Sequence, residues 1–151
     1  MSRSRPEINF SIALIIVFLS ALLQMKLRFP YGEKADLLLA GLIALAYFIN
    51  GFELVVLASF GYFILVGPVL YPEYLYLVLM SLVGVLITRY FLKGGWLTTA
   101  ILVIFLVPGF YLLADKILLF KFSPIILWDT VWSLLWAFFI LLIISNPLTK
   151  R

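Results

Sequence analysis

The sequence predicts an all-α, polytopic membrane protein, folded as a compact bundle of about six transmembrane helices with no soluble domain. Of its 151 residues, 66% are hydrophobic and only 12% are charged, whereas soluble domains are about half apolar and a quarter charged. A soluble protein of this size could not bury so many apolar side chains, so the surplus must face lipid. The polar stretches between the apolar runs are too short to form a second domain.

Six apolar runs, together forming one integral membrane domain over residues 1–151, are the expected spans. A bilayer core requires about 20 apolar residues per helix. The runs cover residues 8–25, 35–50, 54–70, 74–88, 96–114 and 125–145. Because several runs are short for a full crossing, four or five crossings is the alternative count.

The first three runs are delimited by charges and turn residues. The first follows a basic N-terminal segment and lacks a cleavage site, so we interpret it as an uncleaved helix. The second begins at Asp36, whose carboxylate is placed to cap the free N–H groups of a helix start. Asn50-Gly51 forms the next turn, and Gly67-Pro68 weakens the end of the third run.

The last three runs carry further start and stop signals. The fourth ends at Arg89. Pro108 interrupts the fifth and removes one backbone hydrogen bond, which predicts a kink. The sixth has Ser123 as its N-cap and Pro124 as its first helical residue, a favourable combination for a helix start.

Basic residues decide the expected orientation by a small margin. With six spans, the side of the termini holds Arg3, Arg5, Arg89, Lys93, Lys150 and Arg151, and the other side holds Lys26, Arg28, Lys34, Lys116 and Lys121. The two counts are nearly equal, and the basic pair before the first run favours cytoplasmic termini in a bacterial cell membrane. The net charge of +4 is spread over connections and ends, which favours anionic lipid over nucleic acid as its partner.

Residues for catalysis are scarce. The chain has no cysteine and no histidine, which removes thiol nucleophiles, disulfides, imidazole bases and the common zinc sites. It also lacks a Ser-Lys or Ser-His dyad, a pair of intramembrane aspartates and a glycine-rich phosphate loop. We therefore expect no enzymatic activity, no cofactor and no metal site.

Asp129 is the most informative acid, because it lies a turn or so inside the sixth run. Ser133 follows one turn later on the same face. One hypothesis is a buried ion pair with Lys116, Lys121 or Arg89. The other is an interfacial carboxylate in the water of the lipid headgroups.

Two further patterns concern helix faces. Trp128, Trp132 and Trp136 are spaced by four and form one stripe, in which Trp128 suits the membrane interface and Trp136 suits packing between helices. An aromatic wall for a ligand is the alternative. Gly84 and Thr88 have the small-xxx-small spacing that allows helices to approach closely, within a bundle or in a homo-oligomer.

Four stretches of the chain combine apolar runs with charges and glycines at characteristic places. They are LSALLQMKL, the acid-led KADLLLAGLIALAYF, the glycine-bearing NGFELVVLASFGYFILVGPV, and YLYLVLMSLVGVLITRYFLK, which closes on basic residues. Together they resemble the MreD family, the small integral membrane component of the bacterial rod-shape complex. The resemblance covers nearly the whole chain.

The resemblance implies a non-catalytic scaffold of cell-wall elongation, which binds an MreC-like protein and other membrane proteins of that complex through its helix faces. By position, Asp36 and Arg89 are candidate partner contacts, with Asp129, Gly84 and Trp136 as further candidates. The alternative function is the substrate-binding membrane subunit of a vitamin or metal transporter, with Trp128, Trp132 and Tyr74 lining a pocket. A polar-lined cavity would favour the transporter subunit, and a filled core would favour the scaffold.

Overall fold

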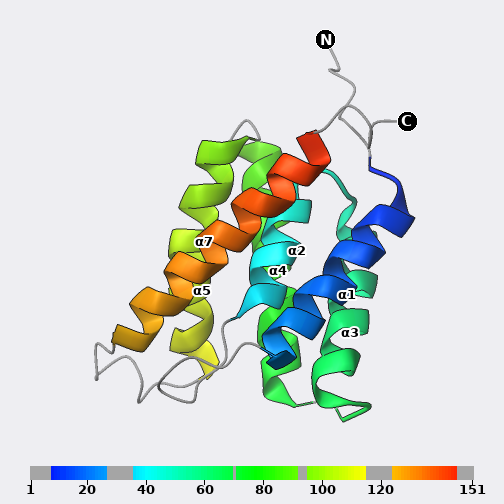
Figure 1. The fold of residues 1–151 in the computed structure, drawn as a ribbon, viewed down its shortest axis with the longest axis vertical. Coiled ribbons are helices and arrows are strands. Elements are labelled where there is room, and N and C mark those ends of the chain that lie inside the picture. The colour runs from blue at the N-terminus through cyan, green and yellow to red at the C-terminus, as the bar shows by residue number, and fades with distance from the viewer. Residues whose placement is uncertain (1–7, 27–35, 70, 92–94, 115–123, 146–151) are drawn as a thin grey trace.

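The computed structural model is all-helical in the part of the chain that it describes, residues 8–26, 36–69, 71–91, 95–114 and 124–145. Its six helices there are α1 (Phe10–Lys26), α2 (Leu37–Leu45), α3 (Gly51–Val66), α4 (Pro72–Tyr90), α5 (Trp96–Ala114) and α7 (Pro124–Ser145). The predicted all-α class is confirmed for these residues. Successive helices alternate in direction, so α1 begins and α7 ends at the same end of the bundle, the upper end in Figure 1.

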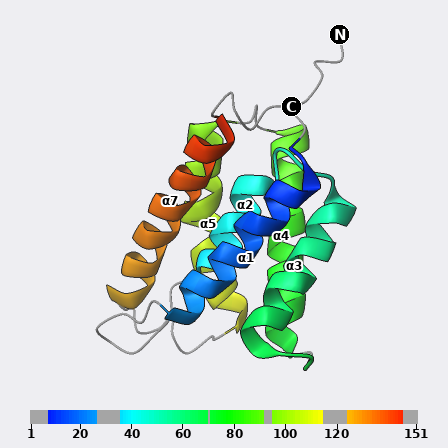
Figure 2. The same cartoon turned by 45° about the vertical axis from the view of Figure 1, so that its right-hand side comes forward.

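Helix α2 is the central element of the bundle. It packs against α1, α3, α4, α5 and α7, while the outer helices contact one another in the order α1, α3, α4, α5, α7. Figures 1 and 2 show α2 behind the diverging α1 and α7 and enclosed by the others. All nine residues of α2 are buried. An α-helix that is apolar all round must be surrounded by other apolar groups, and here protein supplies them.

The expected span over residues 35–50 is a regular helix over only part of its length. Helix α2 has nine residues, which extend about 14 Å at 1.5 Å per residue, roughly half of a hydrocarbon core. Its last turn tightens, because the N–H of Ala46 bonds to the carbonyl of Ile43 at 3.2 Å. The chain then turns directly into α3. The run as a whole passes along the bundle, from Asp36 beside Glu73 at the start of α4 to Asn50 beside Arg89 at its end, and protein surrounds its helical part.

The other helices follow the predicted runs with small shifts at their ends. Helix α3 begins three residues before the predicted 54, where the backbone N–H of Asn50 donates to the Glu53 carboxylate at 3.1 Å. It ends at Gly67, whose φ of +88° lies in the left-handed region that favours glycine. Pro124 is the first residue of α7, as predicted, whereas Ser123 lies outside the described residues. Helix α5 continues through Pro108.

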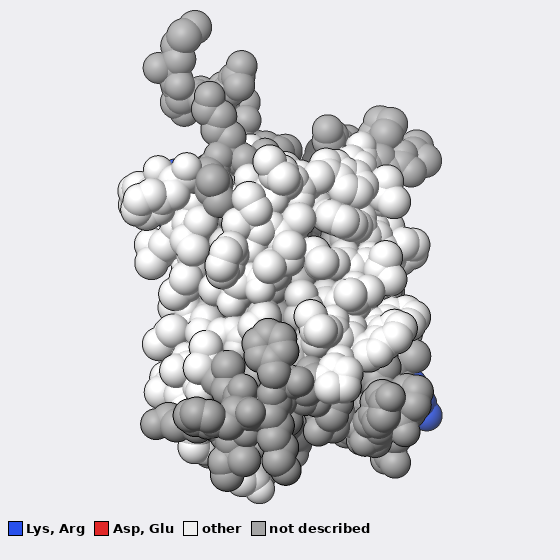
Figure 3. Space-filling model, turned by 90° about the vertical axis from the view of Figure 1, so that its left-hand side faces the viewer, with Lys and Arg blue, Asp and Glu red and all other residues white. Residues whose placement is uncertain are grey.

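Three helices, α4, α5 and α7, are long and apolar enough to cross a membrane. Helices α1 and α3 are apolar but shorter, with 17 and 16 residues, or about 25 Å each. On the side of α5 and α7 the described surface is uncharged over most of its area (Figure 3). Large apolar side chains such as Phe105 and Leu142 are 71% and 56% exposed. A surface of this kind matches the hydrocarbon of a bilayer.

Helices α1 and α7 approach each other across α2 at one glycine. A Cβ atom on Gly41 would lie 2.6 Å from Oγ and 3.3 Å from Cβ of Ser20, so only glycine allows α1 to pack this closely. The Ser20 hydroxyl donates to the carbonyl of Ile16 at 2.8 Å. It accepts the indole N–H of Trp136 at 2.9 Å, which links α1 to α7.

Candidate functional site

Two buried aspartates and a tyrosine join the start of α2 to two outer helices. The backbone N–H of Asp36 donates to Oδ1 of Asp129, on α7, at 2.7 Å. The hydroxyl of Tyr111, on α5, donates to Oδ2 of the same carboxylate. Asp36 and Asp129 are 6% and 1% exposed. These three residues, the polar junction, fix the start of α2 against α5 and α7.

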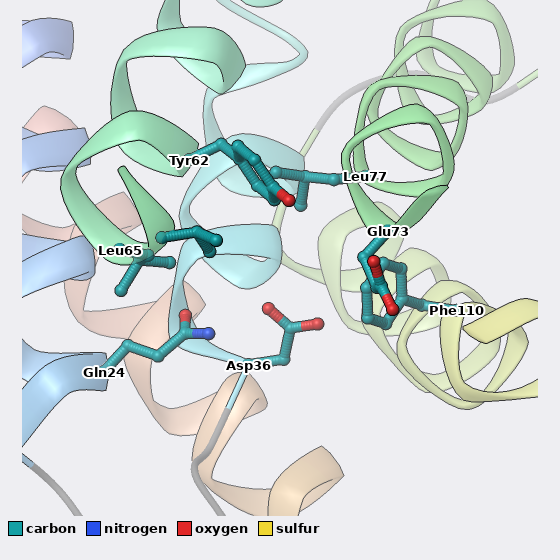
Figure 4. A pocket seen from close by; sticks show the side chains of 8 residues that line it. Gln24, Asp36, Tyr62, Leu65, Glu73, Leu77 and Phe110 are labelled. Atoms are coloured by element: carbon teal, nitrogen blue, oxygen red, sulfur yellow. The ribbon is translucent and has the colours of Figure 1, made fainter. Parts of the chain in front are cut away.

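Asp36 caps α2 as the sequence predicts, but it does so inside the protein. Its Oδ1 accepts the N–H of Leu39 at 3.4 Å. The N–H of Leu38 donates to Oε1 of Gln24, on α1, at 2.8 Å, and the Gln24 amide points towards the Asp36 carboxylate (Figure 4). With the bond from Asp36 to Asp129, three N–H groups at this helix start find side-chain acceptors, so the end of α2 can be buried without loss of hydrogen bonding.

The burial of Asp129 excludes one of the two hypotheses for its carboxylate. An interfacial carboxylate surrounded by headgroup water is wrong, because the side chain is almost fully buried. Of the proposed cationic partners, Lys116 and Lys121 lie outside the described residues. Arg89 instead donates to Oδ1 of Asn50 at 3.0 Å. This bond lies at the C-terminal end of α4, whereas Asp36 lies near its N-terminal end.

A cavity of about 200 Å³ lies beside the polar junction, between α1, the start of α2, α3, α4 and α5. Figure 4 shows the polar side chains converging on it from several of these elements. Its polar lining consists of Gln24, Asp36, Tyr62 and Glu73, and its apolar lining of Leu65, Val66, Leu77 and Phe110. Asp129 is not among the lining residues.

The aromatic wall of the cavity is held in place by neighbouring groups. The Tyr62 ring packs against the Tyr74 ring, with 5.2 Å between centroids. The Tyr74 hydroxyl is hydrogen-bonded to the Ser59 hydroxyl at 2.8 Å, and the Tyr62 hydroxyl accepts the N–H of Tyr71 at 3.3 Å. These contacts tie α3 to the start of α4, so the wall is preformed.

The five partner-contact candidates separate into interior and surface residues. Asp36 and Asp129 meet in the polar junction, and Gly84 is buried, with Leu106 and Ala46 nearest to it. Each of these three holds the bundle together. Trp136 is half-buried and Arg89 is exposed. A contact between Arg89 and a partner protein stays a prediction.

The tryptophan stripe does not line the cavity. Trp128 and Trp132 are 54% and 40% exposed on the outside of α7, where indole rings suit the membrane interface. Trp136 packs towards α1, as predicted for a residue between helices. Tyr74 stands directly behind the cavity wall, so one of the three aromatic residues proposed for a pocket lies near it.

Four lining residues, Gln24, Tyr62, Glu73 and Phe110, were not predicted as site residues. They lie on four different helices, and their convergence depends on how those helices pack. Of these four residues, Gln24 alone could be recognised from the sequence as a site candidate, because it is an amide within the first apolar run. An amide at such a place requires a hydrogen-bonding partner when it is buried.

Ser133, one turn after Asp129, provides a stability prediction. Its Oγ is buried and has no hydrogen-bond partner, whereas Ser20 Oγ bonds to two groups. We expect Ser133→Ala to leave thermal stability in detergent unchanged or slightly higher, because no bond is lost. The matched variant Ser20→Ala should cost about 1 kcal/mol, since it leaves the Trp136 N–H without an acceptor. Equal losses in the two variants would contradict this assignment.

The described residues form a cavity beside the polar junction. No group of three or more Asp or Glu residues that could hold a metal ion occurs in the ranges that the structure describes. What the geometry offers is a preformed, partly open cavity with two carboxylates, an amide and two aromatic rings. Comparison with known proteins adds no assignment, since no family model, no curated protein and no solved structure matches the chain.

Proposed function

We propose that the chain is a non-catalytic scaffold in the bacterial cell membrane, belonging to the cell-wall elongation complex. Two features support this function. The sequence resembles the MreD family over nearly its whole length, and the described residues form one helical bundle with large apolar side chains on its outer faces. A protein of this shape binds other membrane proteins through its helix sides and short turns.

The observation that carries the proposal is the complete burial of α2 within the bundle. Its nine residues are all buried and contact every other described helix, so most of the interior is occupied by protein. The surfaces left for interaction are the outer faces of the remaining helices. In this proposal the outer helices cross the bilayer, both termini lie in the cytoplasm, and α2 supports the bundle from within.

Co-purification tests the scaffold directly. The tagged chain is expressed with an MreC-like membrane protein and extracted in a mild detergent. We expect the two to elute together at a fixed ratio. Recovery of the tagged chain alone, under conditions that preserve its helical content, would contradict the scaffold.

Arg89 is the candidate contact that reaches the surface, and it can be tested in the same assay. We expect Arg89→Ala to reduce recovery of the partner by about threefold to tenfold, the range typical of one exposed charge at an interface. The matched control is Asn50→Ala, which breaks the same bond between Arg89 and Asn50 while leaving the charge in place. Equal recovery with both variants would show that Arg89 acts only within the bundle.

The cavity favours a second candidate, the substrate-binding membrane subunit of a small-molecule transporter. Converging polar groups in a preformed cavity are typical of ligand sites. Co-expression with a transporter ATPase module distinguishes this function: stable co-purification with that module, together with none with an MreC-like protein, would favour the transporter subunit.

A further inference from the structure

The cavity holds two carboxylates that no cation of the protein neutralises in the described structure. Asp36, 6% exposed, receives the N–H of Leu39 and the amide of Gln24. Glu73, in the first turn of α4, forms no hydrogen bond or ion pair within the described part of the chain. Among the described residues, no Lys or Arg lines the cavity. A buried carboxylate without a counter-charge is costly, and a cation placed between Asp36 and Glu73 would offset that cost.

The rest of the lining selects the kind of cation. Leu65, Leu77 and Phe110 form an apolar wall, which suits a short hydrocarbon chain. The rings of Tyr62 and Phe110 also border the cavity (Figure 4), and aromatic faces attract organic cations. The two carboxylates supply at most four oxygen ligands, because Oε1 of Gln24 already accepts the N–H of Leu38, whereas a hard metal ion such as Ca²⁺ takes six or more.

We propose that this cavity binds an ammonium group carried on a short hydrocarbon body. The ammonium lies between Asp36 and Glu73, and the hydrocarbon part lies against Leu77 and Phe110. A soluble alkylamine and the headgroup of phosphatidylethanolamine share this chemistry. The cavity has this property whether the chain acts as a scaffold or as a transporter subunit, because it depends only on the residues that line it.

Binding of n-butylammonium to the purified full chain in detergent tests the proposal by calorimetry. We expect n-butylammonium to bind about tenfold or more tightly than neutral 1-butanol, which has the same hydrocarbon body and no charge. Glu73 is exposed, so we expect Glu73→Gln to leave folding intact. This variant should weaken binding about fivefold to tenfold. Asp36→Asn, which keeps a capping side chain, should weaken it further. Glu53→Gln, an acid in the first turn of α3 and outside the cavity, should leave binding unchanged.

Three results would overturn the proposal. They are equal binding of 1-butanol and n-butylammonium, loss of binding in Glu53→Gln to the same extent as in Glu73→Gln, and displacement of the amine by an equal concentration of Na⁺. The last result would assign the carboxylates to an inorganic cation.

The source of the ammonium is settled by lipid exchange. The chain is placed in nanodiscs of phosphatidylethanolamine or of phosphatidylglycerol, which lacks an ammonium, and retained lipid is measured by native mass spectrometry. Retention of phosphatidylethanolamine that is lost in Asp36→Asn and Glu73→Gln indicates the headgroup. Equal n-butylammonium affinity in both nanodiscs indicates a soluble amine. Absence of both phosphatidylethanolamine retention and amine binding would refute the site.

Discussion

Replacing Asp129 with leucine is expected to lower the stability of the bundle more than any other single change proposed for it. The Asp129 carboxylate accepts both the N–H of Asp36 and the hydroxyl of Tyr111. Asp129→Leu would leave these two donors without their acceptor inside the protein. Each such donor costs about 1–3 kcal/mol, so we expect a loss of about 2–5 kcal/mol and a fall in melting temperature of roughly 5–15 °C in detergent.

Two matched variants isolate the cause of this loss. Asp129→Asn keeps an oxygen that can accept the N–H of Asp36, so it should retain more stability than Asp129→Leu. Tyr111→Phe removes one of the two donors, so the double variant Asp129→Leu, Tyr111→Phe should lose less than the sum of the single variants. Additive losses, or an Asp129→Leu variant as stable as the natural chain, would show that the polar junction does not stabilise the start of α2.

A single added methyl group at Gly41 is expected to separate α1 from α2. The new Cβ would lie 2.6 Å from Oγ of Ser20, which is held by its bonds to Ile16 and Trp136. The Ser20 side chain or α1 must move, and overpacking of this kind costs about 1–3 kcal/mol. We expect Gly41→Ala to lower the melting temperature by several degrees, although alanine is the better helix former.

Gly84→Ala is the matched control for Gly41→Ala, because it adds the same methyl group inside another helix. A Cβ on Gly84 would lie 3.6 Å from Leu106 and 3.8 Å from Ala46, which are ordinary contacts. The gain in helix propensity, up to about 1 kcal/mol, should then leave stability unchanged or higher. A larger loss for Gly84→Ala than for Gly41→Ala would contradict the packing described for α2.

The sequence pattern predicts most helices of this fold, but it cannot distinguish lipid from protein as the surroundings of an apolar helix. The run after Asp36 is apolar on every face, which is the pattern of a membrane span and of a helix buried in a core. Only its contacts with the other helices show that it is a helix buried in a core. The role of Asp36 as a helix cap was predictable, because it depends on neighbours three residues away.

The cavity depends on information that a linear pattern does not contain. Gln24 and Glu73 are 49 residues apart in sequence by their numbers, and they meet because α1 ends where α4 begins. One partner of Asp129 was also hidden, since it is the backbone N–H of Asp36. Charge alone predicts ion pairs, whereas a carboxylate is satisfied equally well by N–H and hydroxyl donors.

The proposed scaffold function and the proposed ammonium site would use different parts of the molecule. Partner proteins would contact the outer faces, such as the exposed apolar surface of α5 and α7. The cavity lies beside the start of α2, among α1, α3, α4 and α5. A ligand held by Asp36 and Glu73 would join the start of α2 to the start of α4, and so would stabilise the bundle on which a partner assembles.

The most direct measurement for the central claim, that protein encloses α2, is disulfide formation on two sides of it. The chain has no natural cysteine, so paired substitutions report without background. A Cβ on Gly41 would lie 3.3 Å from Cβ of Ser20, and a Cβ on Gly84 would lie 3.8 Å from Cβ of Ala46. Both separations are close to those of disulfides.

We therefore expect the pairs Ser20→Cys, Gly41→Cys and Ala46→Cys, Gly84→Cys each to form an intramolecular disulfide on mild oxidation in native membranes. The control pairs are Ile15→Cys with Gly41→Cys, and Ala46→Cys with Leu86→Cys. Ile15 and Leu86 are 55% and 52% exposed on the outsides of α1 and α4, so these pairs should remain reduced. Free thiols, counted in monomeric chains after denaturation, provide the readout. Disulfides in both test pairs and in neither control would confirm the enclosed helix, and test pairs that stay reduced while the controls oxidise would contradict it.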